Sequence, residues 1–275
     1  ARSDRAAGIR TGGLVSGYRG SPLGGFDQEL WRQKKLLADR AIRFEPGLNE
    51  DLGATMLWGA QQVDAFPGKR VEGVFSMWYG KGPGVDRTGD VFRNANIVGT
   101  SRQGGVLAVA GDDHAAQSSM FPHQTDHVFE GAMMPILFPA SVEEYIEFGL
   151  AGYAMSRFSG LWVAFKAITE TVESGRSMTV QAHDAGAAPR FRLPADIHVP
   201  EGRGFNYDPN LRWPAERSEL ERRILDERLP AALAFMRANP LDRTLVRPRG
   251  ARVGIVTVGK AHGDVLAAFA ALGLS

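Results

Sequence analysis

Most of the chain alternates between short apolar runs rich in β-branched residues and longer stretches with helical periodicity. The apolar runs are nearly continuous, which indicates strands that are buried on both faces. Such strands belong to parallel sheets with helices on both sides, so the pattern predicts an α/β fold with a mostly parallel sheet. Ligands of such folds bind beyond the carboxyl ends of the strands, where we expect the functional residues to gather.

The alternation assigns specific residues to strands and helices. Strands are expected at 12–18, 41–46, 71–78, 104–111, 134–139 and 160–167. Helices are expected at 25–39, 50–63, 86–100 and 141–157. In the first helix, Leu30, Trp31 and Leu37 should form the apolar side. Together these elements predict one domain over residues 1–183.

A second part of the chain is expected after this domain. Residues 184–250 should form a connector, because the first half is rich in Pro, Gly and charge and one helix follows at about 216–238. Residues 251–275 restart the alternation with a buried strand, a turn at Gly259 and an amphipathic helix. We interpret them as the truncated first βα unit of a second α/β domain. With no initiator Met, the chain is expected to be a piece of a longer protein.

Composition excludes several classes of protein. The 275 residues are 44% hydrophobic and 23% charged, and 32 basic against 31 acidic residues give a net charge of +1. This balance provides no general attraction to nucleic acid or to an anionic membrane. There is no run of about 18 apolar residues and no signal peptide, so we expect a cytoplasmic protein. Without cysteine, the chain has no disulfide, thiol nucleophile or cysteine ligand for an iron–sulfur cluster.

Two carboxylates, Glu50 and Asp51, open an otherwise apolar helix of small residues. One interpretation is structural, because Asn49 can cap the helix and acids in a first turn complement the positive end of its dipole. The other is functional. At 3.6 residues per turn Glu50 shares a face with Gly53, Ala54 and Leu57, and nothing large shields it there, so its carboxylate can meet a ligand atom and exchange a proton with it. The pattern favours neither interpretation over the other.

Glycine-rich loops follow the first and third strands. In the first, GYRGSPLGG (17–25), glycines let the backbone approach a ligand, Ser21 offers a hydroxyl, and Arg19 offers a guanidinium that can hold a carboxylate. In the second, Lys81 could meet a phosphate, but no Ser or Thr follows it as in a Walker A motif. A tight connection between strand and helix explains either loop equally well.

The richest polar segment, residues 110–127, follows the fourth strand. His123 and His127 are four residues apart and His114 precedes them, which raises the question of a metal site. The spacing matches no zinc signature, so contact with a substrate is the favoured interpretation. Lys166 ends the last strand and several hydroxyls follow it, and anion binding and ordinary loop polarity explain these residues equally well. No G-x-S-x-G elbow is present, which disfavours a serine hydrolase.

Four segments, in this order, resemble the thiamine-diphosphate-dependent 2-oxoacid:ferredoxin oxidoreductases. They are VSGYRGSPLGGFD, GLNEDLGATMLWGAQ, FSMWYGKGPGVDRTGDVFRNANIVGTSRQGGVLAVAGDDHAAQSS and PHQTDHVFEGAMMPILFPASVEEYIEFG. The likeness covers residues 12 to about 175, and 251–275 resembles the start of the family's second domain. It is greatest to members with a long fused chain that act on indolepyruvate. The resemblance implies the fold of the domain that contacts the aminopyrimidine ring of the cofactor.

The resemblance also implies roles for single residues. The family's essential glutamate falls on Glu50, where it would hydrogen-bond a ring nitrogen and promote the tautomer that takes a proton from the thiazolium carbon. Ser21 falls at the position of a hydroxyl that contacts the substrate. The family commonly has proline in place of Arg19, so a clamp for the substrate carboxylate at Arg19 is our own hypothesis. The residues expected to line the cofactor cleft are Gly20, Gly82, Asp113 and Ser119.

The implied reaction is the oxidative decarboxylation of an aryl 2-oxoacid to an acyl-coenzyme A, with electrons passed through 4Fe-4S clusters to ferredoxin. The family holds thiamine diphosphate and Mg²⁺ mainly through a G-D-G…N motif, and this chain has neither that motif nor cysteine. We therefore expect it to be inactive alone and to depend on the remaining domains.

A second copy of the chain is a further expected partner, with contact through Leu52, Met56 and Trp58. Two alternatives to the leading interpretation are kept. The chain could belong to a pyruvate-type or other 2-oxoacid oxidoreductase, or it could be a non-catalytic α/β module for subunit contact.

Overall fold

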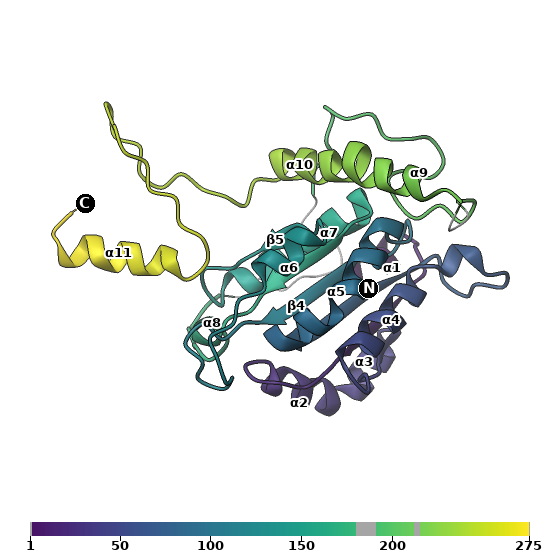
Figure 1. Ribbon diagram of the computed structural model, residues 1–275, viewed down its shortest axis with the longest axis horizontal. Helices are drawn as coiled ribbons and strands as arrows, with labels where there is room; N and C mark the ends of the chain where they lie inside the picture. Colours follow the sequence, from purple (N-terminus) through teal and green to yellow (C-terminus); the bar gives the residue numbers. More distant parts are fainter. Residues whose placement is uncertain (1, 180–190, 212–214, 275) are drawn as a thin grey trace.

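The computed structural model describes residues 2–179, 191–211 and 215–274. One sheet of six strands forms its centre (Figure 1). The strands are β1 (Thr11–Gly17), β2 (Ile42–Phe44), β3 (Gly73–Lys81), β4 (Val106–Gly111), β5 (Ile136–Leu137) and β6 (Trp162–Lys166). Their order is β2-β1-β3-β4-β6-β5, and every neighbouring pair is parallel. The α/β class is confirmed, and all six strands expected between residues 12 and 167 are present with shifted ends.

The helices in the first part of the chain follow the predicted pattern with differences. They are α1 (Arg2–Ala6), α2 (Gly24–Arg32), α3 (Lys34–Asp39), α4 (Glu50–Ala60), α5 (Gly82–Val98), α6 (Asp126–Gly131), α7 (Glu144–Ser159) and α8 (Thr169–Val172), with a 3-10 turn η1 at Val63–Ala65. The helix expected at 25–39 is interrupted at Gln33, and Trp31 is 46% exposed rather than on a buried side. Helix α5 begins at Gly82 rather than 86, because proline fits the first turn of a helix and Pro83 stands there.

The helices divide between the two faces of the sheet according to the direction of each crossover. The connections that contain α4, α5 and α6 run towards β5, whereas those that contain α2 with α3 and α7 run the opposite way. Because crossovers between parallel strands are right-handed, opposite directions place helices on opposite faces. Burial agrees with this. Ala108 and Ala110 of β4 pack in one cluster with α4, α5 and α6, and Leu107 and Val109 pack in another with α2 and α7.

Buried aromatic rings fix α5 on the sheet. The Phe92 ring of α5 lies 4.9 Å from the Trp78 ring and 6.0 Å from the Trp162 ring, measured between centroids, and all three side chains are fully buried. Burial of one phenylalanine contributes about 1.5–3 kcal/mol to folding. This packing holds the first turn of α5, at Gly82, at the carboxyl edge of the sheet.

The helix expected at about 216–238 is present as one continuous helical stretch. It consists of α9 (Arg217–Arg222), a π-helical segment η2 (Arg223–Arg228) and α10 (Leu229–Ala238), which packs on α7 (Figure 1). Arg228 is fully buried and donates hydrogen bonds to the carbonyls of Phe205 and Val98, at the end of α5. Burial, followed by the charge of Arg223, lowers the pKa of Arg228 to about 9. Of the expected connector, residues 184–190 and 212–214 lie outside the described residues.

The last segment corrects one expectation. The turn at Gly259 and the helix α11 (Ala261–Ala271) are present, but residues 251–258 form no strand. Val253 and Val256 are 81% and 92% exposed, and the segment extends away from the sheet (Figure 1, yellow). The reason is physical, because a strand needs a neighbouring strand to satisfy its backbone groups and a covered face for its apolar side chains.

None of the described helices has the length and hydropathy that a membrane span needs.

An ion pair ties the N-terminal helix to α7. Asp4 accepts hydrogen bonds from Arg157 (2.7 Å) and from the Thr11 hydroxyl (2.7 Å), and the carboxylate is largely buried. Burial acts to raise the pKa of Asp4, but the bonds from Arg157 and Thr11 outweigh it and hold the pKa below its ordinary value of 3.8. The pair therefore stabilises the fold above that value, and this stabilisation is lost as the pH falls through the lower pKa of the folded state.

Replacement of Asp4 by Asn should accordingly destabilise the fold in a pH-dependent way. At pH 7 the Asp4→Asn variant should lose about 1–3 kcal/mol of unfolding free energy, because the partly buried Arg157 guanidinium loses its charged acceptor. The deficit should shrink once the pH is below 3.8. Urea denaturation across pH measures this, with Asp196→Asn, in an exposed pair with Arg237, as the near-neutral control. An equal deficit at every pH contradicts the assignment.

Candidate functional site

The carboxyl ends of β1 and β3 bring most of the predicted site residues to one edge of the sheet. The loop after β1 places Gly20 beside the Lys81 side chain at the end of β3, where an added Cβ would lie 3.1 Å from Lys81 Cδ. In the first turn of α5, Gly82 lies against the ring of His123, which leaves no space for a side chain. Next to it, Gly84 lies against Glu50. Segments far apart in the sequence therefore meet here.

The N-terminus of α4 has the cap that the sequence predicts. Asn49 is extended (φ −154°), and its side chain accepts a hydrogen bond from the Leu52 amide at 2.9 Å. The buried residues of α4 are Gly53, Ala54 and Leu57, which confirms the predicted inner face that Glu50 shares. Glycine at 53 is required by the packing, because a Cβ there would lie 3.1 Å from the backbone of Gly17.

The two acids of this helix differ in their surroundings. Asp51 forms an ion pair with Arg87 of α5 at 3.1 Å. Glu50 is half-buried, and within the described parts of the chain its carboxylate has no hydrogen-bond or ion-pair partner. Asn49 and Asp51 thus perform the structural role that the sequence allowed for this turn, and the Glu50 carboxylate is left available to a ligand.

The backbone and the neighbours of Glu50 nevertheless hold its side chain in place. The Trp78 indole of β3 donates a hydrogen bond to the Glu50 carbonyl at 3.1 Å. At Gly84 a Cβ would lie 2.5 Å from Glu50 Cγ and 2.7 Å from Oε1, so only glycine leaves room for this carboxylate. The backbone of Glu50 is thus fixed while its carboxylate oxygens stay available, which is the geometry of a preorganised hydrogen-bond acceptor.

Cations lie at the same edge. Lys81 is half-buried and Arg19 is exposed, and neither makes an ion pair with a described residue. Ser21, in the same loop as Arg19, is also exposed. A guanidinium and an ammonium without carboxylate partners give this part of the edge a positive potential, which suits an anionic group of a ligand.

The Asp113 carboxylate is used within its own loop. It accepts hydrogen bonds from the amides of Gln117 (2.9 Å), Ser118 (2.7 Å) and Ser119 (3.0 Å). Burial acts to raise the pKa of Asp113, but the bonds from Ser118 and Gln117 outweigh it and lower the pKa. Asp113 and Ser119 therefore shape the loop, and their contact with a cofactor stays a prediction.

The three histidines of this region lie beside different carboxylates. His123 Nε2 is 2.8 Å from Asp86, His114 Nε2 is 3.8 Å from Asp112, and His127 is exposed beside Glu130. Among the residues that the structure describes, no group of three or more histidines and acids is placed to hold a metal ion.

A buried charge cluster at the ends of β4 and β6 was not predicted. Lys166 is 2% exposed, and its Nζ lies 3.1 Å from Asp112 and 2.5 Å from Asp126. Asp112 also accepts hydrogen bonds from the amide and hydroxyl of Thr125, and so closes the base of the loop between them. The expectation that Lys166 is either an anion ligand or a solvated loop residue is thus wrong. A lysine at the end of an otherwise apolar strand was the signal, but its partners follow only from the order of the strands in the sheet.

Comparison with known protein families finds no match, and comparison with curated proteins finds none either.

The charge cluster should be sensitive to removal of its cation. Lys166→Met should lower the unfolding free energy by about 3–5 kcal/mol, because it leaves the buried Asp112 carboxylate without a counter-charge. Asp126→Asn should cost less, since the Asp126 side chain is 41% exposed. Urea denaturation measures both variants. A loss under about 1 kcal/mol for Lys166→Met would show that the cluster does not hold the loop.

Proposed function

We propose that this chain is the pyrimidine-binding domain of a thiamine-diphosphate-dependent 2-oxoacid:ferredoxin oxidoreductase of the indolepyruvate type. The observation that carries the proposal is the half-buried Glu50 carboxylate, which has no partner among the described residues and lies at the carboxyl edge of a parallel sheet. The ordered resemblance of four segments between residues 15 and 149 supports the same assignment. The whole enzyme's activity, and its place in the cytoplasm, are part of the proposal.

The residues at the edge fit an aminopyrimidine ring. Glu50 offers a carboxylate oxygen to a ring nitrogen, and glycine at 20, 82 and 84 lets Lys81, His123 and Glu50 pack closely against the backbone of this edge. The chemistry that thiamine diphosphate supplies when bound is nucleophilic attack on a 2-oxo carbon, followed by decarboxylation. The diphosphate and its Mg²⁺ are assigned to another domain, because the motif that binds them is absent from this chain.

The chain's own residues then have three tasks in this proposal. Glu50 holds a proton at the ring nitrogen and releases it during the cycle. The Arg19 guanidinium binds the carboxylate of the 2-oxoacid through parallel hydrogen bonds, and the Ser21 hydroxyl contacts the substrate. The iron–sulfur clusters are assigned to the remaining domains, since no cysteine is present here, and coenzyme A and ferredoxin are assigned to the same domains.

A specific observation also favours contact with a second protein surface. Leu52 and Met56 are four residues apart on one side of α4 and are 47% and 37% exposed, and Leu48, just before the helix, is 87% exposed. This stripe lies on the same helix as Glu50, so a surface that covers it would also close the site from water. We propose that a second copy of the chain covers it, as in symmetric dimers.

Replacement of Glu50 by Gln tests the catalytic role. In the complete protein, Glu50→Gln should slow exchange of the thiazolium carbon proton for deuterium by about 10²–10⁴-fold, because an amide cannot accept and return the proton. The exchange is followed by NMR after acid quench. Asp51→Asn is the matched control, since Asp51 already pairs with Arg87, and it should leave the exchange rate almost unchanged.

Exchange at the wild-type rate in Glu50→Gln, with cofactor still bound, would remove the catalytic role. The non-catalytic subunit-contact interpretation would then be preferred.

The apolar stripe on α4 is tested by the oligomeric state. Light scattering coupled to size exclusion should report a dimer for the chain and a monomer for Leu52→Glu, because a charge would be buried in the contact. Leu36→Glu on α3 is the control, since Leu36 is equally exposed at 45% and lies away from α4. A wild-type chain that stays monomeric at high concentration contradicts the dimer.

A further inference from the structure

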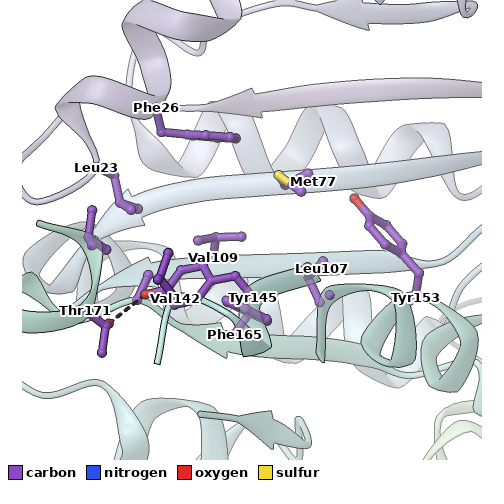
Figure 2. Close-up of a pocket in the computed structure, with 13 residues that line it drawn as sticks. Leu23, Phe26, Met77, Leu107, Val109, Val142, Tyr145, Tyr153, Phe165 and Thr171 are labelled. Carbon is purple, nitrogen blue, oxygen red and sulfur yellow. Dashed lines mark hydrogen bonds between the residues drawn. The ribbon is translucent and has the colours of Figure 1, made fainter. Parts of the chain in front are cut away.

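A cavity of about 320 Å³ lies on the face of the sheet that α2 and α7 cover (Figure 2). Its floor is formed by Met77 of β3, Leu107 and Val109 of β4, and Phe165 of β6. Phe26 of α2 stands on one side of it. The cavity lies on the opposite face of the sheet from α4, and Glu50 is not among its lining residues.

The topology explains why this space exists. Among the described residues, two crossovers place helices on this face, α2 with α3 from β1 to β2 and α7 from β5 to β6. Helix α7 packs on β4 and β6, and the space lies between it and α2, over Met77 of β3 and the neighbouring residues of β4. Protein interiors contain few voids larger than a water molecule, whereas this one reaches the size of small-molecule sites, which start at about 300 Å³.

The lining selects for one kind of ligand. None of the 13 residues that line the cavity carries a charge, and most are aliphatic or aromatic. Tyr145 and Thr171 pair their hydroxyls at 2.8 Å at one end and so satisfy each other. At the opposite end the Tyr153 hydroxyl has no hydrogen-bond partner among the described residues (Figure 2). Burial raises the pKa of Tyr153, so this hydroxyl keeps its proton and acts as a donor.

We propose that this cavity binds an uncharged aromatic group, and that the Tyr153 hydroxyl donates a hydrogen bond to the guest where the guest carries an acceptor. The rings of Phe26, Tyr145 and Phe165 provide edge and face contacts for an aromatic guest. A carboxylate stays outside, since no lining residue offers a cation. Two sources share this chemistry, a free neutral aromatic molecule and the side chain of an aryl 2-oxoacid. The proposal does not depend on the role of Glu50.

The test uses indole as the probe and the methyl group of Met77 as the reporter. The chain is labelled with ¹³C-methyl methionine, and the Met77 signal is assigned from its loss in Met77→Leu. Titration with indole should shift that signal in a saturable way. Benzaldehyde, which carries an oxygen acceptor, tests the Tyr153 hydroxyl. Tyr153→Phe should weaken the binding of benzaldehyde by roughly two- to tenfold, which is the effect of one hydrogen bond.

A glycine substitution fills the cavity without a clash. Gly149 of α7 lines it, and an added Cβ meets no atom within 4 Å. Gly149→Leu should therefore fold and weaken indole binding at least tenfold. Gly59→Leu is the matched control, because Gly59 is also a helical glycine with open space but lies in α4 on the other face. Circular dichroism melting checks that both variants are folded.

The outcomes distinguish the two sources of the ligand, and they include results that contradict the proposal. If indole-3-pyruvate shifts the Met77 methyl and Gly149→Leu abolishes the shift, the cavity takes the side chain of an aryl 2-oxoacid. If indole and other neutral aromatics shift the Met77 methyl signal but indole-3-pyruvate does not, the ligand is a free neutral molecule. Absence of a saturable shift with every probe, or equal affinities for Gly149→Leu and Gly59→Leu, overturns the proposal. These results leave the Glu50 exchange experiment unaffected.

Discussion

All six strands run in the same direction, and this single constraint determines where chemistry is possible in the molecule. Parallel pairing requires a crossover after each strand, and the right-handed crossover fixes the face on which each helix lies. The carboxyl ends therefore meet at one edge, where the loop after β1 places Gly20 beside Lys81 at the end of β3, and the first turn of α5 places Gly84 against Glu50 of α4. The same rule leaves a gap between α2 and α7 on the opposite face of the sheet, over β3 and the adjoining part of β4, which is where the apolar cavity lies.

Electrostatic contrast distinguishes Glu50 from the other acids of this edge. Asp112 is compensated by Lys166, Asp113 by three loop amides, and Asp51 by Arg87. Removal of a carboxylate from water is unfavourable, and proteins normally offset it with such partners. Glu50 is half-buried and has no such partner among the described residues, while its backbone is fixed by Trp78. The Glu50 carboxylate is therefore suited to bind a ligand, because the local structure does not depend on its charge.

Local patterns were sufficient for much of this account. Apolar runs located the strands, Asn49 located the start of α4, and helical spacing identified Gly53 and Ala54 as its inner face. Features that depend on distant partners were not accessible. The pairing of Lys166 with Asp112 needs the order of β4 and β6, and the contact of Glu50 with Gly84 needs the position of α5. The apolar pattern at 251–258 predicted a strand, yet a strand cannot form without a neighbouring one.

The central claim is that Glu50 is reserved for a ring nitrogen of the cofactor. A crystal structure of the complete protein with thiamine diphosphate tests it most directly. The account predicts a Glu50 carboxylate oxygen within about 2.6–3.2 Å of an aminopyrimidine nitrogen, with α4 and Gly84 in their present arrangement. A bound cofactor whose pyrimidine lies away from this edge, or a Glu50 side chain paired with a protein cation in that complex, would contradict it.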